Sequence, residues 1–582
     1  MLKEYRTLFP YWRKYLPRYL MGFLFLFITD AGQLYLPQII RRVIDHIAAG
    51  AVDLRLVGRN MAVMVAIAFF IAVGRFGWRF FIHGSSRRIE KELRGRFFDH
   101  LLTLSSSFYS RNKVGDMMAR ATSDMNHVRM ASGMGFVALF DGLFMTVFII
   151  AILFVQYPGI APFVLIPFPF VTLLVLGIGP FLGKYFKAVQ EGYASLSGHV
   201  QEALSGIAVL KSFTQEKYNV DVFRGKNEEY KQRNLSLVRL WGFFFPLIGF
   251  LSGIVSLLLL RFGGFAVLEG RMSTGDFIAA FSYLGMLIWP MLGAGFTVNL
   301  IQRGGASLQR INEVLNEKPD ITSPAGGIRS RASGDIRIKN LTYAYPDAGK
   351  PVLKNISVDI RSGTTLGILG RTGSGKSTFI KILPRLIDPP EGTVFIGGKD
   401  VHEYDLSTLR ASIGMVPQET FLFSASIREN IAFAKPDIPD GEVDRAIRVS
   451  TIERDLSTFP DGVSTEVGER GITLSGGQKQ RIAISRAVIV HPNILVFDDA
   501  LSSVDTATEE QILKEFLDLR KGKTNIIISH RVSTLQHADK IIVLDEGRIV
   551  QEGGHEELVE TEGFYSEIYN LQKLEDGTPE VP

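Results

Sequence analysis

The chain has 582 residues, too many for one ordinary domain, so at least two domains are expected. Its formal net charge of +5 is small for this length and argues against a nucleic-acid partner. There is no cysteine, which excludes disulfide bonds and thiolate chemistry. The hydrophobic share of 46% is high for a soluble protein and low for a wholly membrane-embedded one, which favours a membrane half joined to a soluble half.

The first segment, residues 1–18, is basic and aromatic and reads MLKEYRTLFPYWRKYLPR. The apolar stretch after it lacks a convincing small-residue cleavage site, so no cleavable signal peptide is expected. We interpret this stretch as a first membrane span whose N-terminal end lies inside the cell.

Six segments before residue 302 are apolar enough to cross a bilayer, which takes about 20 mainly apolar residues. The first and third contain one acid each, Asp30 and Asp141. The second is the weakest, because Arg75 and Arg79 interrupt it. The predicted spans are 19–40, 58–83, 132–155, 159–182, 241–260 and 277–301.

Long, charged and helix-favouring links separate predicted spans two and three, and spans four and five. Basic residues cluster in the first of these links, which places it in the cytoplasm. They are Arg87, Arg88, Lys91, Arg94 and Arg96. The other links are short. We therefore expect membrane helices that continue beyond the bilayer and turn back in cytoplasmic loops.

The pattern changes after a Pro/Gly/Ser-rich segment, TSPAGGIRSRASGD. Beyond it, short β-branched runs such as TTLGILG, ILVFDD, TNIIISH and IIVLDEGRIV alternate with helical segments, which predicts an α/β domain with a largely parallel sheet. The predicted organisation is an α-helical membrane domain at 1–321, a linker at 322–335 and the α/β domain at 336–575.

The sequence GRTGSGKST follows the apolar strand TTLGIL and precedes the helical FIKILPRL. It fits the phosphate-loop (Walker A) pattern G-x-x-x-x-G-K-[ST] in the strand–loop–helix context that the pattern requires. Its glycines let backbone amides face the phosphates, Lys376 supplies a positive charge, and Ser377 supplies a hydroxyl for Mg²⁺. The predicted loop residues are Gly370, Arg371, Thr372, Gly373, Ser374, Gly375, Lys376, Ser377 and Thr378.

A second motif, LSGGQKQRIAISRA, is followed directly by ILVFDD. Together they resemble the signature and Walker B motifs of ATP-binding-cassette (ABC) proteins. Further landmarks of that family stand in the same order. They are Tyr345 for the aromatic on adenine, Gln418 for the Q-loop, 464–471 for the X-loop, Asp505 for the D-loop and His530 for the switch histidine.

The N-terminal half extends this resemblance. FFDHLLTLSSSFYSRNKVGDMMARATSDMNHVR and GGASLQRINEVL are similar to the first cytoplasmic loop and the last-span exit of bacterial ABC exporters. The chain is thus identified as a half-transporter of the multidrug or lipid exporter type, with six spans followed by a P-loop nucleotide-binding domain that has a helical subdomain. The resemblance implies a dimer in the bacterial cytoplasmic membrane, with the ATPase domain in the cytoplasm.

The family arrangement implies that ATP lies between the phosphate loop of one chain and the signature of the other. Expected contacts across that interface come from Ser475, Gly476, Gly477, Gln478 and Asp505. Expected Mg²⁺ contacts come from Ser377, Gln418 and Asp498. Expected catalytic residues are Asp499, His530 and Gln418. Coupling helices, which pass motion to the spans, are expected near 111–126 and 211–222.

Asp499 departs from the family pattern, which has glutamate after the Walker B aspartate. The side chain is shorter by one methylene, so its carboxylate is set back by roughly an ångström, which can cost about 10²-fold in rate. The resemblance therefore predicts a degenerate site that holds ATP and hydrolyses it slowly. Because the signature is intact, a heterodimer with a second half-transporter is favoured over a slow homodimer.

Charges within spans are costly and often functional. Asp30, Gln33 and Asp141 are candidates for a substrate cavity, with interhelical pairing as the alternative, whereas Arg75 and Arg79 are interpreted as pairing or snorkelling residues. Family resemblance suggests export of small amphipathic molecules such as drugs or lipids, with membrane lipids as surroundings. An exporter-fold importer of metal chelates and a non-hydrolytic regulatory half remain alternatives, and the six spans argue against a soluble ABC protein.

Overall fold

The computed structural model describes residues 3–50, 54–346, 349–468 and 474–576. The chain divides into two compact units. Unit 1 comprises Met1–Leu102 and Lys113–Glu317, and unit 2 comprises Thr103–Asn112 and Lys318–Pro582. The predicted linker at 322–335 falls in unit 2, and its boundaries stay a prediction.

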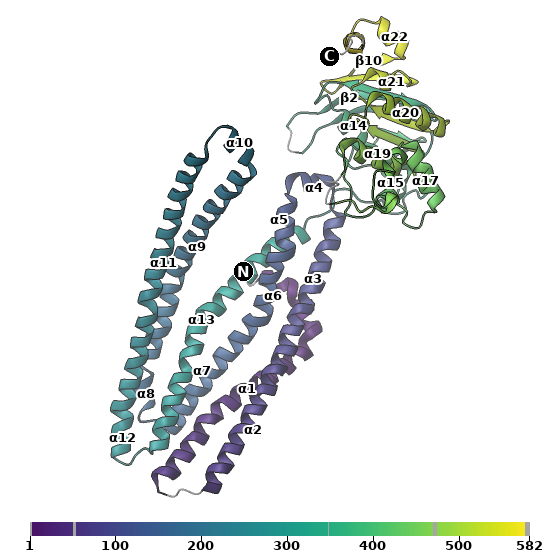
Figure 1. The fold of residues 1–582 in the computed structure, drawn as a ribbon. Helices are drawn as coiled ribbons and strands as arrows, with labels where there is room; N and C mark the ends of the chain where they lie inside the picture. Colours follow the sequence, from purple (N-terminus) through teal and green to yellow (C-terminus); the bar gives the residue numbers. More distant parts are fainter. Residues whose placement is uncertain (1–2, 51–53, 347–348, 469–473, 577–582) are drawn as a thin grey trace. The chain divides into compact units, whose positions relative to one another are not determined.

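Helices form the described part of unit 1 (Figure 1). Four short π-helical segments, η2 to η5, interrupt the long helices. The elements are η1 (Glu4–Leu8), α1 (Phe9–Ala48), α2 (Leu54–Trp78), η2 (Arg79–His83), α3 (Gly84–Thr103), α5 (Val114–Ala119), η3 (Arg120–Asp124), α6 (Met125–Met130), η4 (Ala131–Gly135), α7 (Phe136–Gln156), α8 (Ala161–Leu165), α9 (Pro167–Ser205), α10 (Ile207–Ser212), α11 (Glu216–Leu258), η5 (Leu259–Gly263), α12 (Gly264–Leu268) and α13 (Thr274–Leu315).

Six continuous helical stretches in the described residues are long and apolar enough to cross a membrane, as predicted. They are Glu4–Ala48, Leu54–Thr103, Val114–Gln156, Ala161–Ser205, Glu216–Leu268 and Thr274–Leu315. Each has between 42 and 53 residues. At about 1.5 Å per residue they measure roughly 60–80 Å, about twice the hydrocarbon core of a bilayer. These lengths agree with the expectation that the helices extend beyond the membrane, which stays a prediction.

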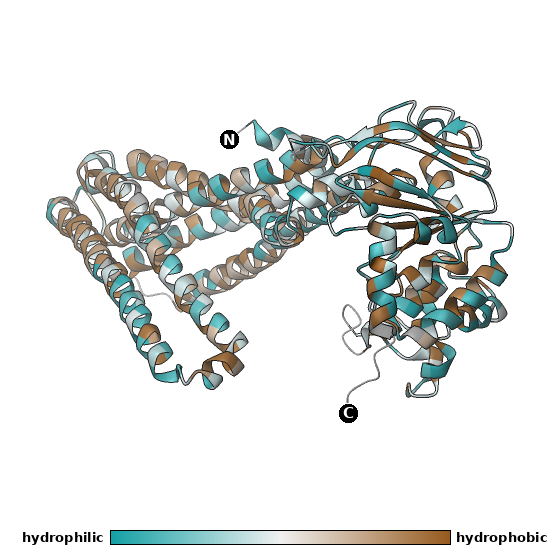
Figure 2. Cartoon of the chain, turned by 90° about the horizontal axis from the view of Figure 1, so that it is seen from above, coloured by the Kyte–Doolittle hydropathy of each residue, from teal (hydrophilic) through white to brown (hydrophobic). Residues whose placement is uncertain are grey.

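Within unit 1, α13 packs against α1 and α7, while α9 and α11 run side by side and meet at α10 (Figure 1). Tyr283 and Leu287 of α13 are fully buried in a core that they share with Ile149 of α7. Hydrophobic residues also cover outward faces of the long helices (Figure 2), and Phe76 and Phe250 are examples of exposed aromatic side chains there. Such surfaces suit contact with lipid.

Unit 2 contains two sheets. The larger has the order β10-β9-β3-β8-β7-β6, and its five strands from β9 to β6 are parallel. The smaller is antiparallel, with the order β2-β1-β4-β5. The strands are β1 (Ile336–Tyr343), β2 (Leu353–Ile360), β3 (Thr365–Gly370), β4 (Val394–Ile396), β5 (Lys399–Asp400), β6 (Ile413–Val416), β7 (Ile494–Asp498), β8 (Thr524–Ile528), β9 (Lys540–Asp545) and β10 (Arg548–Gly553).

The apolar runs TTLGILG, ILVFDD and TNIIISH form β3, β7 and β8, whose residues are all buried, and the predicted parallel sheet is confirmed. The run IIVLDEGRIV is instead two antiparallel strands, β9 and β10. Glu546 and Gly547 between them both have positive φ, which closes a tight hairpin. The sequence signal for this turn is only two residues long, an acidic residue followed by glycine, so the run is interpreted from its sequence as one strand.

Helices complete unit 2. They are α4 (Ser106–Arg111), α14 (Lys376–Ile382), η6 (Val401–Glu403), α15 (Leu406–Ser412), α16 (Ile427–Ile431), α17 (Asp440–Val449), α18 (Glu453–Leu456), η7 (Gly462–Ser464), α19 (Gly476–Val488), α20 (Thr506–Leu519), α21 (Val532–Leu535), α22 (His555–Glu560) and α23 (Phe564–Asp576). Ile431 of α16, Ile447 of α17 and Ile482 of α19 share one core, which forms the predicted helical subdomain.

The first cytoplasmic link is divided between the two units, and the expected coupling range of 111–126 stays a prediction. The part of this link that belongs to unit 2 is Thr103–Asn112, which ends where the expected coupling range of 111–126 begins. Its helix α4 is tied to the rest of unit 2 by a bond from the Ser106 hydroxyl to the Leu386 carbonyl (2.7 Å). In the second link, the expected range of 211–222 spans the end of α10 and the first turns of α11.

Candidate nucleotide-binding site

The phosphate loop connects the buried strand β3 to α14, as its sequence predicts. Gly375 is the residue before the helix and has φ +102°, where a side chain is strained. A Cβ at this position would also lie 2.8 Å from Leu353. Only glycine therefore lets the loop turn tightly enough to aim the first amides of α14 at one point.

Lys376 begins α14 and is largely buried. Its amine donates to the carbonyl oxygens of Gly370 (2.6 Å) and Arg371 (2.9 Å), so the ammonium group is held at the mouth of the loop. Burial lowers the pKa of Lys376, and the negative charges of Asp499 and Asp498 oppose that shift. The arrangement places one cation between the loop and two carboxylates.

Ser377 and Asp498 meet at the C-terminal end of β7. The Ser377 hydroxyl donates to Oδ1 of Asp498 at 3.1 Å. Burial raises the pKa of Asp498, and this hydrogen bond partly offsets the shift. A hydroxyl and one carboxylate, completed by phosphate oxygens, are the donor set that Mg²⁺ prefers at nucleotide sites. The described residues contain no cluster of three acids or histidines that would bind a metal by themselves.

Most of the predicted loop, magnesium and catalytic residues surround one cavity of about 240 Å³. Sequence reasoning missed Val352 and Ile528, apolar lining residues that carry no motif signal. Gly370 and Arg371 lie outside the lining, and the Arg371 guanidinium instead stacks over the Phe564 ring at 5.1 Å. The lining residues are Val352, Thr372, Gly373, Ser374, Gly375, Lys376, Ser377, Thr378, Gln418, Asp498, Asp499, Ile528 and His530.

Asp499 adopts a left-handed backbone conformation, with φ +51°. Its amide donates to the Ile528 carbonyl (3.0 Å), which fixes the turn at the end of β7. Among side chains with a Cβ, aspartate and asparagine tolerate this conformation best. The same backbone conformation would cost a glutamate at this position about 1 kcal/mol. The glutamate side chain would also reach farther into the cavity.

Tyr345, the residue expected on adenine, lies beside α14. Its hydroxyl is 3.2 Å from the Thr378 hydroxyl, and its ring meets Tyr343 edge-on with centroids 5.4 Å apart. It lines a separate cavity of about 510 Å³ rather than the one beside Lys376. Its role toward a base therefore stays a prediction.

The signature motif begins α19, where Ser475 and Gln478 form a capping box. The Ser475 hydroxyl accepts a bond from the Gln478 amide (3.3 Å), which leaves its own proton free to donate. Gln480 accepts from the Ser503 amide and donates to Ser502, which joins the D-loop to this helix. Of the predicted X-loop, 469–471 lie outside the described residues.

Asp505 has a structural task in the D-loop. Its carboxylate caps α20 by accepting the Thr508 amide at 3.0 Å, and this bond lowers the pKa of Asp505. Gly477 approaches the D-loop so closely that a Cβ would lie 3.0 Å from the Ser503 carbonyl. The signature and the D-loop therefore pack closely against one another.

Comparison with known proteins agrees with both halves of this architecture. Residues 19–291 match the family model for the ABC transporter transmembrane region, and residues 353–502 match the family model described as ABC transporter. The chain is 36% identical to the probable multidrug resistance ABC transporter ATP-binding/permease protein YheI of Bacillus subtilis over 97% of both chains. It is 34% identical to the multidrug resistance-like ATP-binding protein MdlA of Escherichia coli over 98% of this chain and 97% of that one.

The chain belongs to the ABC transporter family. It is an exporter-type ATPase with fused membrane and nucleotide-binding domains, and it lies in the membrane with its ATPase domain in the cytoplasm. The structure of a bacterial Atm1-family ABC exporter with ATP bound shares the fold, with a TM-score of 0.77, 24% identity, and coverage of 97% of this chain and 99% of that one. Transporters of this kind act as dimers.

The transporter's predicted cavity residues come together in unit 1. Gln33 and Asp141 line a cavity of about 370 Å³ between α1, α7 and α13. Asp30 is buried and does not line the cavity. Arg75 lies close enough on α2 to act electrostatically on both acids.

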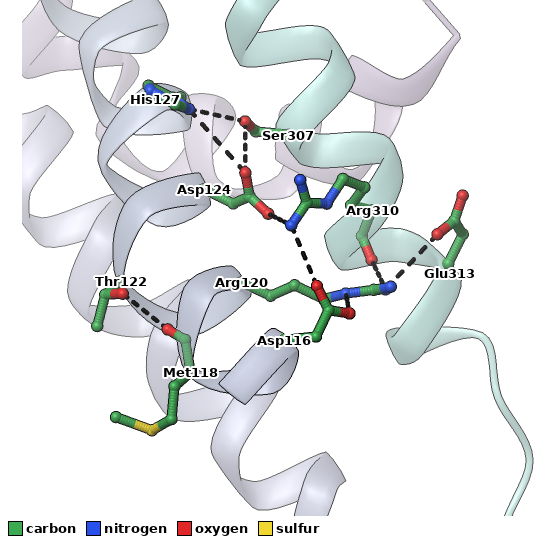
Figure 3. A network of polar contacts seen from close by, with 9 residues as sticks. All are labelled: Asp116, Met118, Arg120, Thr122, Asp124, His127, Ser307, Arg310 and Glu313. Atoms are coloured by element: carbon green, nitrogen blue, oxygen red, sulfur yellow. Dashed lines mark hydrogen bonds and ion pairs between the residues drawn. The ribbon is translucent and has the colours of Figure 1, made fainter. Parts of the chain in front are cut away.

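A polar network that sequence reasoning missed joins η3 and α6 of the transporter to α13 (Figure 3). Its centre is the buried Asp124, which accepts the Ser307 hydroxyl (2.8 Å) and pairs with Arg310 (3.1 Å). His127 lies 3.0 Å from the same hydroxyl. One face of α13 thus contacts the third helical stretch through an ion pair and hydrogen bonds.

The network continues toward the end of α13 (Figure 3). Arg120 pairs with Asp116 (2.9 Å) and with Glu313 (3.5 Å), and it donates to the Arg310 carbonyl (2.5 Å). Asp116 also receives Arg310 at 3.4 Å. Asp116, Arg120 and Asp124 recur every four residues, which shows a common helix face, but no local pattern names Arg310 as their partner.

Proposed function

We propose that this chain exports small amphipathic molecules across the membrane as one half of a dimeric ABC exporter, and that its own Walker site hydrolyses ATP slowly. Support for the substrate class comes from the similarity to the multidrug resistance proteins and from 33% identity to the ATP-dependent lipid A-core flippase of Syntrophus aciditrophicus over 84% of this chain. A cavity between membrane helices supports the same class.

The binding half of the site is complete. Lys376 and the loop amides are placed for phosphates, and Ser377, Asp498 and Gln418 would hold Mg²⁺. When bound, Mg²⁺ neutralises charge on the transferring phosphate. The chain's own contribution is to desolvate and orient the triphosphate beside Lys376. ATP binding is therefore expected to be tight.

The hydrolytic half is impaired at one residue, and Asp499 is the observation that carries the proposal. It faces the cavity with His530 and Lys376, but its carboxylate is one methylene short of the glutamate that normally orients the attacking water. A displacement of roughly an ångström is enough to lower a rate by about 10²-fold. The site then holds ATP for a long time before hydrolysis takes place.

The other half of the interface is intact, which supports a heterodimer. Ser475 keeps a free hydroxyl proton, and Gln480 fixes the D-loop against α19. These groups serve the phosphate loop of the partner chain. A partner with glutamate after its Walker B aspartate would therefore have a fast site, while this chain supplies the slow one.

The test is ATP turnover by the purified full-length protein in lipid nanodiscs, alone and with a candidate partner. We expect slow turnover alone and an increase of about 10-fold to 10²-fold in Asp499→Glu, because the longer side chain reaches the water position. Asp499→Asn is the matched control, since it keeps the shape and removes the base. Equal turnover of the wild type and Asp499→Glu would contradict the slow-site proposal, and robust turnover by a homodimer would contradict the heterodimer.

A further inference from the structure

The membrane cavity of the transporter has polar side chains on one side and apolar side chains on the other. Asp141 of α7 and Gln33 of α1 supply the polar wall. Met145, Met286 and Trp289 supply the other, and Trp289 has 78% of its surface exposed. The volume of about 370 Å³ lies within the range of small-molecule sites.

Asp30 of α1 is 1% exposed and is close enough to Asp141 for the two acids to act on one another. Its Oδ1 finds no hydrogen-bond donor among the described residues. Asp141 is near enough to act on the Asp30 carboxyl both as a charge and as a hydrogen-bonding partner. Two carboxyl groups can hydrogen-bond to one another only if one of them carries a proton, so a bonded pair would share one proton and carry one negative charge.

Among the described residues, Arg75 is the counter-charge that acts on both acids. The charged groups that act on Asp30 are Asp141 on α7 and Arg75 on α2. The α13 wall contributes Met286 and Trp289, which are uncharged. The pair and Arg75 together are therefore neutral, and an added cation is tolerated in this low-dielectric place only if a proton leaves.

We propose that the cavity binds a monovalent organic cation through Asp141 and that the bound cation replaces the proton shared by Asp30 and Asp141. The O–H bond of the carboxylic acid breaks, its proton goes to water, and the resulting carboxylate pairs with the cation, so the site is neutral before and after. This inference rests on the proposed export function and assigns its substrate class.

The apolar wall strengthens the choice of a cation. A tryptophan face attracts a cation within about 6 Å, and thioether groups of methionine are soft and adaptable partners for an irregular organic ligand. An anion of the same size would meet the negative charge of the acid pair. The one proton of the pair is shared between Asp30 and Asp141 and would not be available to donate to the anion. Discrimination by sign of charge is therefore the distinguishing property of the site.

The experiment compares two probes of the same shape and opposite charge, tetraphenylphosphonium and tetraphenylborate. Binding to the full-length protein in nanodiscs is measured by titration calorimetry in buffers of different ionisation enthalpy, with empty nanodiscs subtracted. We expect the phosphonium to bind, to release about one proton, and to bind up to tenfold more tightly for each unit that pH rises. We expect the borate to bind at least tenfold more weakly.

Asp141→Asn should weaken phosphonium binding by at least tenfold and abolish proton release, because the amide cannot become an anion. Glu269→Gln is the matched control, since it removes an exposed acid outside the cavity and should change neither quantity. Trp289→Leu leaves both acids in place, so it should weaken phosphonium binding and preserve proton release. This variant also tests the proposal if the acid variants fold poorly.

Equal affinity for the two probes, or unchanged binding and proton release in Asp141→Asn, would overturn the cation site. These measurements need no ATP, so they fail or succeed independently of the turnover test with Asp499→Glu. A transporter with a confirmed slow ATPase site and no charge selectivity would retain the proposed export function and lose only this substrate class.

Discussion

The nucleotide cavity and the membrane cavity each have two aspartates and one basic side chain in or beside them, but the charges of the acids are balanced differently. Asp498 and Asp499 are neighbours in sequence, and Ser377 and Lys376 satisfy them. Asp30 and Asp141 come from different helices and act on one another, and the proposal gives them one shared proton. We expect the first pair to receive a metal and phosphates, and the second to exchange its proton for an organic cation.

Removing the cation of the nucleotide cavity should have the largest effect. Lys376→Met is expected to weaken ATP binding by at least about 10²-fold, because the buried ammonium is the fixed counter-charge to the phosphates. Binding is measured with a fluorescent ATP analogue on the nanodisc-embedded protein. Lys399→Met, which removes an exposed lysine on β5, should bind as the wild type does. Unchanged binding in Lys376→Met would remove the basis for the phosphate site.

Acid should act on the nucleotide cavity through Asp498. Since burial raises the pKa of Asp498, its carboxylate becomes protonated at a higher pH than an ordinary aspartate does. We expect Mg²⁺-dependent ATP binding to weaken as pH falls, by up to tenfold per unit once the group titrates. ATP binding without Mg²⁺ is the control and should lack this loss. A loss of the same size in chelator would place the titrating group elsewhere.

Breaking the polar network should cost less, because Arg310 is partly exposed. Asp124→Asn and Arg310→Gln are each expected to lower stability by about 1–2 kcal/mol, and the double variant should cost less than the sum. Thermal unfolding in nanodiscs measures the change. Arg303→Gln on the same helix is the comparison variant. Strict additivity would show that Asp124 and Arg310 act separately.

The smallest effect is expected at the cation of the membrane pair. Arg75 is exposed, so its field is weaker than that of the buried Lys376. Arg75→Met should change phosphonium affinity by about twofold to threefold, and in the direction of tighter binding, because a like charge is removed. The same calorimetry checks it. A large loss of affinity would mean that Arg75 holds the pair in place.

The sequence predicted the parts of the molecule that depend on local pattern. The six spans follow from runs of apolar residues, and the phosphate loop follows from glycines at fixed spacing before Lys376. Most of the nucleotide cavity was predictable for the same reason, because carboxyl ends of parallel strands meet at one edge and bring Asp498 close to the loop.

The remaining features depend on contacts between distant residues of ordinary type. Ser307 reaches Asp124 across 183 positions, and nothing near either residue marks the other. The approach of Asp30 to Asp141 could likewise be predicted only if the rotation of two long helices were known. The conformation of Asp499 was also invisible, because its residue type shows a tolerance for positive φ but does not require it.

The π-helical segment η4 lies on the third helical stretch between Asp124 and Asp141. A π turn takes in one residue more than an α turn, so it advances the phase of all later side chains by about 100° relative to an uninterrupted helix. Deleting one residue from 131–135 would leave Asp124 against α13 and swing Asp141 away from Asp30. The one extra residue of η4 thus lets Asp124 face α13 while Asp141, on the same helical stretch, faces Asp30.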